Sequence, residues 1–364
     1  MFITDIELVD FRNYSNTQIN FSKKIVILLG KNAQGKTSFL ESILLASTAR
    51  SPIEKKNYNL IKFGNNKANI KVKFNNYRKQ NNTINMIIDH NYKTVMVNKI
   101  KINKTSELLG NFNTVYISPI DMELIQGEPS YRRNFLDRFN FQIINKYAYL
   151  IKNYKEQLKN RNAFIKEKNI DKVYLDVIDK EIVNIGIKII KYRNNAIEYI
   201  NDILSKKFVD IFDNINIKYL PGAPIDSKSY LDKLKKNLEK DISFGTTTTG
   251  PHRDNFITQI NNNDARLFAS NGQKRLLSLA LKIAETDYIQ YKTHESPIVL
   301  IDDALLELDK NNLTKIINLF LNYEQIILTT TTLENLPENI IQQAEVVEVE
   351  NGIPQKRLYG TVAK

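Results

Sequence analysis

The segment that most constrains this chain is an eight-residue loop near its start, Gly30-Lys31-Asn32-Ala33-Gln34-Gly35-Lys36-Thr37. It fits the pattern G-x-x-x-x-G-K-[ST] at every fixed position. Residues 25–29 before it are apolar and β-branched, which predicts a strand buried on both faces, and residues 37–45 after it predict a helix. Strand, glycine loop and helix therefore stand in the order that a phosphate-binding loop requires.

The residue types in this loop suit a bound polyphosphate. Such a ligand needs several backbone N–H donors at close range, and the glycines let the backbone curl tightly enough to supply them. Lys36 would reach the β- and γ-phosphates, and the Thr37 hydroxyl would occupy a coordination position on Mg²⁺. The alternative is a glycine turn with an unrelated lysine, which would match the four fixed positions in roughly one chain of this length in a hundred.

The composition excludes several kinds of chemistry. The 364 residues include no cysteine, so the chain has no disulfide, thiolate nucleophile or cysteine-ligated metal, and a reducing cytosol is the simplest setting. The three histidines, His90, His252 and His294, lack the paired spacing of a zinc site. The start of the chain is acidic rather than basic and apolar, and no long apolar run occurs. We therefore expect a soluble, cytoplasmic protein without a membrane partner.

The chain is strongly basic. Its 52 Lys and Arg residues oppose 40 Asp and Glu residues, which gives a formal net charge of +12. Such an excess favours nucleic acid or another polyanion as a partner. The richness in Lys, Asn, Ile and Tyr offers a second explanation, because an AT-rich coding sequence would produce the same bias whatever the function. The charge alone leaves both explanations open.

The pattern of apolar residues changes along the chain. Up to about residue 117, short apolar runs alternate with turn signals, which predicts a mixed α/β lobe. From about residue 129 the period becomes helical, with one apolar stripe over residues 151–165 and another from residue 175 to about residue 203, unless Gly186 bends the second helix. The Pro- and Gly-rich residues 221–224 end this helical stretch.

A second part of the nucleotide site lies far along the chain. Residues 297–301 predict a buried strand that ends in Asp302 and Asp303. A phosphate-binding fold places its Mg²⁺-orienting acid at such a strand end, so we assign Asp302 to the metal and Asp303 to the attacking water. The distance from Lys36 implies a large insertion between the two parts.

A third segment, 268–275, places a small polar residue and a glycine at the start of a predicted helix, in the order Ser270-Asn271-Gly272-Gln273. The unpaired N–H groups there could bind an anion. Taken alone, the segment is explained as well by ordinary serine capping of a helix. Its position just before the Asp302 strand favours a part in the nucleotide site.

Together these motifs resemble the ATP-binding-cassette superfamily and, within it, the RecF family of bacterial recombinational repair proteins. The passages that carry the resemblance are residues 8–14, 30–37, 118–137, 159–162, 250–254, 270–275, and 302–303 with 307–309. The cassette motifs are widespread. The passage around Arg132-Arg133 and the run Gly250-Pro251-His252-Arg253-Asp254 are specific, and they separate this family from transporter subunits.

The resemblance implies a fold of the α/β class: a P-loop ABC-type ATPase head with a mixed sheet, plus an inserted, largely helical second lobe. The ATPase lobe would comprise residues 1–118 and 292–364, and residues 119–291 would form the second lobe that carries the signature motif. Lys36 and Asp303 would be catalytic, and Thr37 and Asp302 would hold Mg²⁺. The implied ATP-binding residues are Gly30, Lys31, Asn32, Ala33, Gln34, Gly35, Lys36 and Thr37, with Ser270, Gly272 and Gln273 from a second copy.

Some positions are less clearly assigned or depart from the wider superfamily. Arg12 could approach the nucleotide, or be a surface arginine at a strand end. Glu307 and Asp309 would form the loop that crosses the dimer interface. Asp303 stands where transporters use Glu, and Thr329 and Thr330 stand where transporters place a switch histidine. No glutamine follows Ser118-Pro119 to match the usual Q-loop, and Gln126 is a weak substitute. His252 and Arg253 could form a hydrogen-bonded turn or contact DNA.

The function implied by the resemblance is ATP-dependent DNA binding in recombinational repair and replication restart. ATP would hold two copies head to tail, the dimer would bind single-stranded and gapped duplex DNA, and slow, DNA-stimulated ATP hydrolysis would release it. RecR and RecO would be partners, with RecA loading and support of the SOS response as the outcome. The alternatives are an ABC-type transporter ATPase subunit, a chromosome-structuring ATPase head, for which the middle is too short, and a nonenzymatic scaffold.

Overall fold

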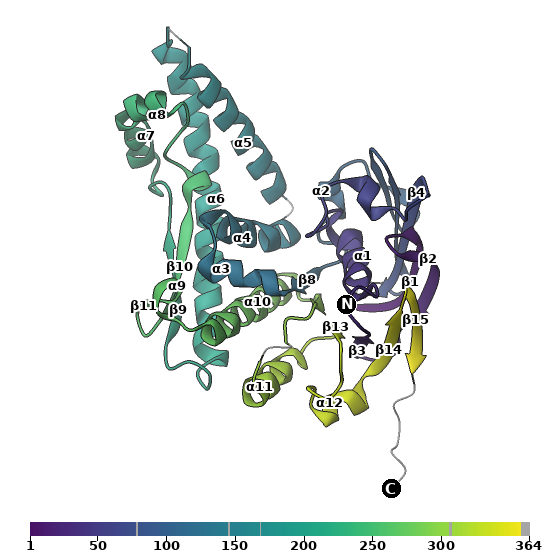
Figure 1. The fold of residues 1–364 in the computed structure, drawn as a ribbon. Coiled ribbons are helices and arrows are strands. Elements are labelled where there is room, and N and C mark those ends of the chain that lie inside the picture. Colours follow the sequence, from purple (N-terminus) through teal and green to yellow (C-terminus); the bar gives the residue numbers. More distant parts are fainter. Residues whose placement is uncertain (78, 145, 168, 306–307, 358–364) are drawn as a thin grey trace. The chain divides into compact units, whose positions relative to one another are not determined.

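The computed structural model describes residues 1–77, 79–144, 146–167, 169–305 and 308–357. The chain divides into two compact units (Figure 1). Unit 1 comprises Met1–Asp121 and Glu285–Lys364, and unit 2 comprises Met122–Ala284. The second boundary falls inside helix α10 (Asn271–Thr293).

The first sheet of unit 1 is antiparallel, with the strand order β2-β1-β4-β5-β6-β7. Its strands are β1 (Phe2–Phe11), β2 (Tyr14–Asn20), β4 (Lys67–Asn75), β5 (Asn82–Asp89), β6 (Lys93–Val97) and β7 (Ile100–Lys101). Buried residues alternate with less buried ones along β4 and β5, as expected where one face of a sheet packs on a core. The start of β2 is polar, so the length of this strand could not be predicted from an apolar pattern.

The second sheet of unit 1 carries the phosphate-binding loop and has the order β15-β14-β3-β13-β12-β8. Its strands are β3 (Ile25–Leu29), β8 (Thr114–Ile117), β12 (Ile298–Ile301), β13 (Ile326–Thr330), β14 (Glu345–Glu350) and β15 (Ile353–Arg357). All pairs are parallel except β14 with β15. Every residue of β8 and β12 is buried, which explains their continuous apolar or β-branched composition.

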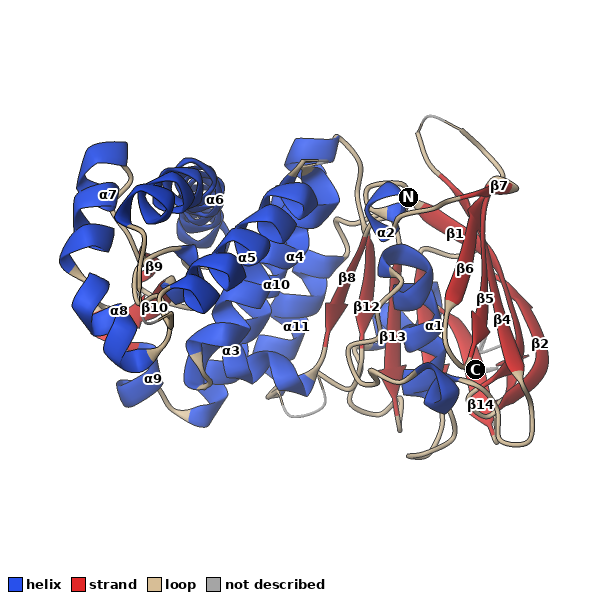
Figure 2. Ribbon diagram, turned by 90° about the horizontal axis from the view of Figure 1, so that it is seen from above, coloured by secondary structure: helices blue, strands red, loops and turns tan. Residues whose placement is uncertain are grey.

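Helix α1 (Lys36–Thr48) lies between these two sheets (Figure 2). It contacts β4 and β5 of the antiparallel sheet and β8 and β13 of the other. Its side chains Phe39, Leu40 and Ile43 are fully buried in one continuous apolar core. The remaining helices of unit 1 are η1 (Asn57–Leu60), α2 (Thr105–Leu108), α11 (Lys310–Phe320) and α12 (Glu338–Gln343), while η2 (Pro119–Met122) crosses the boundary to unit 2.

Unit 2 is built on the helices α5 (Tyr147–Phe164) and α6 (Lys172–Lys207), which pack against each other. Asp171 caps α6, because its side chain accepts hydrogen bonds from the N–H groups of Val173 and Tyr174. The helix runs for 36 residues through Gly186. A Cβ at Gly186 would lie 2.9 Å from the Tyr230 ring, so this glycine allows close packing between the helix and Tyr230.

A small sheet also belongs to unit 2, which the helical pattern of this region concealed. It has the order β11-β10-β9, with β9 (Ile215–Leu220), β10 (Asn255–Ile260) and β11 (Asn263–Asp264). The other helices are α3 (Glu123–Gln126), α4 (Pro129–Ile143), α7 (Ser227–Lys236), α8 (Leu238–Phe244), η3 (Pro251–Arg253) and α9 (Ala265–Phe268). No helix in the described part of the chain combines the length and apolar character of a membrane span.

Candidate nucleotide-binding site

The loop between β3 and α1 has the backbone shape of an anion cradle. Gly35 adopts φ 114°, which an L side chain rarely tolerates, and Ala33 also has positive φ. A Cβ at Gly30 would stand 2.4 Å from the carbonyl oxygen of Val349, and one at Gly35 would stand 2.6 Å from the Asn13 side chain. Both glycines are therefore required by conformation or by close approach, as the sequence pattern predicted.

Neighbouring segments hold this cradle from outside. The Asn13 amide donates to the carbonyl oxygen of Gln34 at 3.0 Å, and the Tyr14 hydroxyl donates to that of Gly35 at 3.0 Å. On the other side, the N–H of Gly352 donates to the carbonyl oxygen of Gln34 at 3.0 Å. These bonds occupy carbonyl groups of the loop, and its N–H groups, apart from that of Gly30, which donates to Thr330, are left to face a ligand. The side chains of Lys31 and Asn32 are exposed.

Lys36 folds back onto its own loop. Its Nζ donates to the carbonyl oxygens of Gly30 at 2.7 Å and Lys31 at 3.0 Å, and the residue is only 4% exposed. Burial lowers the pKa of the ammonium group, whereas the nearby charges of Asp303 and Asp302 raise it. The ammonium group is thus placed beside the loop on two neutral carbonyl partners, which an anionic phosphate could replace.

Thr37 and Asp302 meet although they are distant in sequence. The Thr37 hydroxyl donates to Asp302 Oδ1 at 3.0 Å, and the Tyr116 hydroxyl, from β8, donates to Asp302 Oδ2 at 2.8 Å. Burial raises the pKa of Asp302, and these hydroxyl donors oppose that rise. Tyr116 was not recognised from the sequence, because nothing local shows that β8 pairs beside β12.

Asp303 is fixed by Thr329 at the end of β13. Its N–H donates to Thr329 Oγ1 at 2.9 Å, and that hydroxyl lies 3.0 Å from Oδ1 of Asp303 and 3.0 Å from Oδ1 of Asp302. Asp303 also has φ 51°, an uncommon conformation for a residue with a side chain. Thr330 has a structural part instead, since its carbonyl oxygen accepts from the N–H of Gly30 at 3.2 Å.

These groups surround a cavity of about 560 Å³ in unit 1. Its lining residues are Arg12, Asn13, Asn32, Ala33, Gly35, Lys36, Thr37, Ser38, Asn59, Ile61 and Asp303. The loop, the end of α1 and the second aspartate therefore open into one space, which is the arrangement expected of a polyphosphate site.

Arg12 lines this cavity in a fixed orientation. Its Nε and Nη2 donate to the two carboxylate oxygens of Glu41 at 2.8 and 2.9 Å, and its Nη1 donates to the carbonyl oxygen of Asn59 at 2.9 Å. Glu41 is buried in α1, so this bidentate pair holds the guanidinium plane at the cavity wall. Glu41 and Asn59 carry no sequence signal of their own and were not predicted.

The oxygen donors at this site fit Mg²⁺ carried by a nucleotide. A hydroxyl and a carboxylate 3.0 Å apart are the hard ligands that this ion takes, and it usually completes its shell with phosphates and water. Among the residues described, no group of three or more His, Cys, Asp or Glu side chains could hold a metal by itself. Thr37 and Asp302 would therefore hold the ion only together with a bound polyphosphate.

The signature segment lies in unit 2 at the start of α10. Ser270 and Gln273 form a reciprocal capping box: the Ser270 N–H donates to Gln273 Oε1 at 2.9 Å, and the Gln273 N–H donates to Ser270 Oγ at 3.3 Å. All four residues from Ser270 to Gln273 are exposed. A Cβ at Gly272 would meet no atom closer than the Ser270 hydroxyl at 4.0 Å, so nothing described within the chain requires a glycine there.

The remaining expected site residues have different settings. Glu307 lies outside the described residues, while the Asp309 side chain caps α11 by accepting from the N–H of Asn312 at 3.0 Å. Gln126 ends the short helix α3 and is exposed. Ser118 follows β8, and its buried hydroxyl has no hydrogen-bond partner among the described residues.

The chain is similar over nearly its whole length to proteins of known family. Residues 2–355 match the family model described as RecF/RecN/SMC N terminal domain. The DNA replication and repair protein RecF of Lachnoclostridium phytofermentans is 33% identical over 362 residues, which cover 98% of this chain and 100% of that protein. That of Oenococcus oeni is 32% identical over 369 residues, with 97% and 99% covered.

Solved structures show the same relationship. The recombination mediator protein RecF-ATP of the RecFOR pathway has a TM-score of 0.89 at 30% identity, with 98% of this chain and 97% of that chain covered. An Smc head bound to the C-winged helix domain of ScpA has a TM-score of 0.58 at 17% identity, with 98% and 97% covered, and shares the fold alone. The expected fold, an ABC-type ATPase head with a mixed sheet and a largely helical insertion, is confirmed.

Proposed function

This chain belongs to the RecF family of DNA replication and repair proteins, and we propose that it is an ATP-dependent DNA-binding protein of recombinational repair. ATP is the proposed nucleotide because the related RecF structure is named as an ATP complex. The observation that carries the proposal is the convergence of Lys36, Thr37 and Asp303 on one cavity, with Asp302 bonded to the Thr37 hydroxyl beside it. Gly30 and Gly35 support the same proposal, because a fold that bound no nucleotide would not need two glycines at tightly constrained positions beside these side chains.

The proposed active form is a head-to-tail dimer. Each copy would place its exposed segment Ser270–Gln273 against the γ-phosphate held by the other copy's loop. Gly272 supports this assignment, because its missing side chain leaves room that nothing described in its own chain uses. The capping box would open toward the phosphate, since the unpaired N–H groups at a helix start favour an anion.

In the proposed hydrolysis, Asp303 would orient a water molecule for attack on the γ-phosphorus, and ADP and phosphate would leave. Thr329 fixes the backbone and one carboxylate oxygen of Asp303, so this acid is held before the reaction begins. Lys36 would neutralise charge on the transferred phosphoryl group. The ATPase is proposed to be slow and stimulated by DNA, so that hydrolysis ends a bound state.

The proposed nucleic-acid ligands are single-stranded and gapped duplex DNA. The formal charge of +12 supports a polyanionic partner, and contacts to phosphates would be largely independent of base sequence. By family, the proposed protein partners are RecR and RecO, and the proposed outcomes are RecA loading and support of the SOS response. A cytoplasmic location is part of the same proposal.

One sedimentation experiment tests nucleotide, dimer and DNA together. The wild-type chain is sedimented alone, with ATP, and with ATP plus a gapped duplex, and Lys36→Ala serves as the variant that should lose nucleotide binding. We expect a monomer alone, a dimer with ATP, and a dimer that carries DNA in the third sample. A wild-type chain that binds ATP but remains monomeric would overturn the proposed assembly, and a dimer without DNA would overturn the proposed ligand.

A further inference from the structure

The run Gly250–Asp254 in unit 2 is held far more tightly than a surface turn requires. It contains the short helix η3 and precedes β10. Gly250 has φ 139°, and a Cβ there would lie 2.2 Å from the Tyr154 hydroxyl. The backbone of this run is therefore held in one conformation by close packing at Gly250.

One set of contacts fixes the end of the run at Asp254, which is fully buried. Asp254 Oδ2 accepts from Arg193 at 2.6 Å and also from the Tyr219 hydroxyl, and Oδ1 accepts from the N–H of Gly222 at 2.7 Å. Arg193 also donates to Asp137 and, at 2.7 Å, to the carbonyl oxygen of Pro251. The carboxylates of Asp137 and Asp254 thus both form ion pairs with the buried Arg193.

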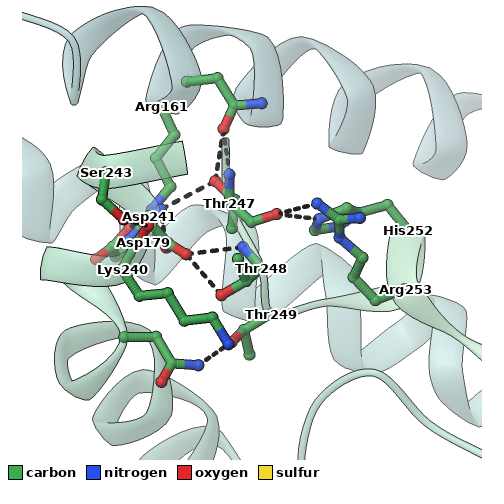
Figure 3. Close-up of polar contacts among 12 residues, drawn as sticks. Arg161, Asp179, Lys240, Asp241, Ser243, Thr247, Thr248, Thr249, His252 and Arg253 are labelled. Atoms are coloured by element: carbon green, nitrogen blue, oxygen red, sulfur yellow. Dashed lines mark hydrogen bonds and ion pairs between the residues drawn. The ribbon is translucent and has the colours of Figure 1, made fainter. Parts of the chain in front are cut away.

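A second set fixes the segment before the run (Figure 3). Arg161 is fully buried and donates to Asp179 at 2.6 Å and Asp241 at 2.7 Å. It also donates to the hydroxyl of Thr247 at 2.9 Å, and Asp241 accepts from the N–H of Thr248 at 2.8 Å. Buried ion pairs of this kind are costly to form and have their best-documented use in specifying one geometry.

His252 bonds the run to the second set, through Thr247, and to α5, through Tyr154. Its Nε2 lies 2.8 Å from the carbonyl oxygen of Thr247 and its Nδ1 lies 2.7 Å from the Tyr154 hydroxyl. A carbonyl oxygen can only accept, so Nε2 carries the proton, and Nδ1 of the neutral ring accepts from Tyr154. His252 is therefore a structural residue of this turn.

Arg253 and Arg133 are the charges that this framework leaves without a counterion. Arg253 is exposed, and its one hydrogen bond to another described residue runs to the carbonyl oxygen of Thr247, at 3.2 Å. Figure 3 draws this bond. Arg133, from α4, donates to the carbonyl oxygen of Asp254 at 3.0 Å and to no other group in the part of the chain that the structure describes. Among the described residues neither guanidinium has an ion-pair partner. Burial lowers the pKa of Arg133, the positive charges of Arg193 and Arg253 lower it further, and the charges of Asp254 and Asp137 oppose this lowering.

We propose that the run Gly250–Asp254 is a rigid platform that presents Arg253 and Arg133 to the phosphodiester backbone of DNA. The inference rests on the proposed function and assigns part of its DNA surface. The guanidinium groups of Arg133, Arg193 and Arg253 lie near one another. The two carboxylates beside them, Asp137 and Asp254, both form ion pairs with Arg193. The free N–H groups of Arg253 and Arg133 form planar forks, which match two phosphate oxygens better than a lysine would.

DNA is favoured over an acidic protein segment by the kind of contact available. The two tethers use carbonyl oxygens and leave most donors of each guanidinium for a ligand. Contacts from Arg133 and Arg253 to phosphate oxygens would position DNA without reading its base sequence.

The test is a salt titration of DNA binding with ATP present. Anisotropy of a labelled gapped duplex is measured over a range of NaCl concentrations for the wild type and for the double variant Arg133→Gln/Arg253→Gln. Each lost phosphate contact should reduce the slope of the log–log plot by about 0.9, so the double variant should lose about 1.8 per chain. Its affinity at low salt should fall about tenfold or more.

Three further variants separate this effect from lost charge and from misfolding. Lys172→Gln/Lys206→Gln removes two exposed charges from the ends of α6 and should keep a slope closer to that of the wild type. The exposed Arg253→Gln alone should lose about 0.9 in slope without a change in thermal unfolding. Arg133→Lys/Arg253→Lys should recover the slope but only part of the affinity, because the fork is lost.

The outcomes distinguish the platform from the proposed function. If the wild type binds no DNA, the proposed function is wrong. If the wild type binds DNA and the double variant matches it in slope and affinity, the platform is wrong while the proposed function stands. Unchanged DNA binding together with lost binding of an acidic protein partner would also overturn the assignment to DNA.

Discussion

Protonation of His252 should destabilise the fold by an amount that follows from its surroundings. Burial lowers the pKa of this imidazole from 6.5 to about 4. Because the folded value lies below the unfolded value, the unfolded chain binds more protons between these two pH values. The stabilising contribution is therefore fully present above about pH 6.5 and is lost as the pH falls through about 4.

The size of the effect comes from the same shift. A change of one pKa unit corresponds to about 1.36 kcal/mol, so the full lowering corresponds to about 3 kcal/mol. At about pH 5 the loss should have reached about 2 kcal/mol, whereas at about pH 7.5 it should be close to zero. Burial is the main physical cause of the lowered pKa, and the positive charges of Arg253 and Arg133 add to it, whereas the hydrogen bond to Thr247 and the charge of Asp241 oppose it.

The variant His252→Gln isolates this contribution. Its side-chain amide keeps an N–H for the carbonyl oxygen of Thr247 but does not titrate. Urea unfolding of the full chain, followed by circular dichroism at about pH 7.5 and about pH 5, should show the wild type losing about 2 kcal/mol more than the variant. The exposed His90→Gln should keep the wild-type difference. Equal losses in the wild type and His252→Gln would refute the buried neutral imidazole.

Further variants test the nucleotide site and the framework of unit 2. Gly30→Ala should destabilise the chain by about 1–3 kcal/mol and weaken ATP binding, because its Cβ would stand 2.4 Å from the Val349 oxygen. Gly272→Ala should unfold at the wild-type temperature but fail to dimerise with ATP. A normal dimer would count against the proposal that Ser270–Gln273 binds the nucleotide of the other copy. Thr329→Val should retain ATP binding in a dialysis assay and lose about tenfold or more in turnover, since it frees Asp303. Arg193→Met should cost about 3–5 kcal/mol in urea unfolding by leaving two carboxylates unpaired, and an unchanged midpoint would contradict the buried network.

The elements that could be predicted were those with a strong local pattern. The strand 25–29 was placed correctly, because a strand buried on both faces is continuously apolar. The helix from residue 175 onward was recognised by its apolar stripe, and it begins somewhat earlier, at Lys172. The β strands of unit 2 were missed as a sheet because β11 is polar and short and the sheet is small.

The sequence by itself determined the loop from Gly30 to Thr37, because the residues that make up a phosphate-binding loop are consecutive in the chain. The family and the order of its motifs were likewise readable from the chain. Only the tertiary structure decided that Tyr116 and Thr329 bond the two aspartates, that Glu41 holds Arg12, and that Arg193 leaves Arg133 without a counterion. These hydrogen bonds and ion pairs join residues that are far apart in sequence. Strand pairing and burial bring such residues together, and no local sequence pattern encodes them.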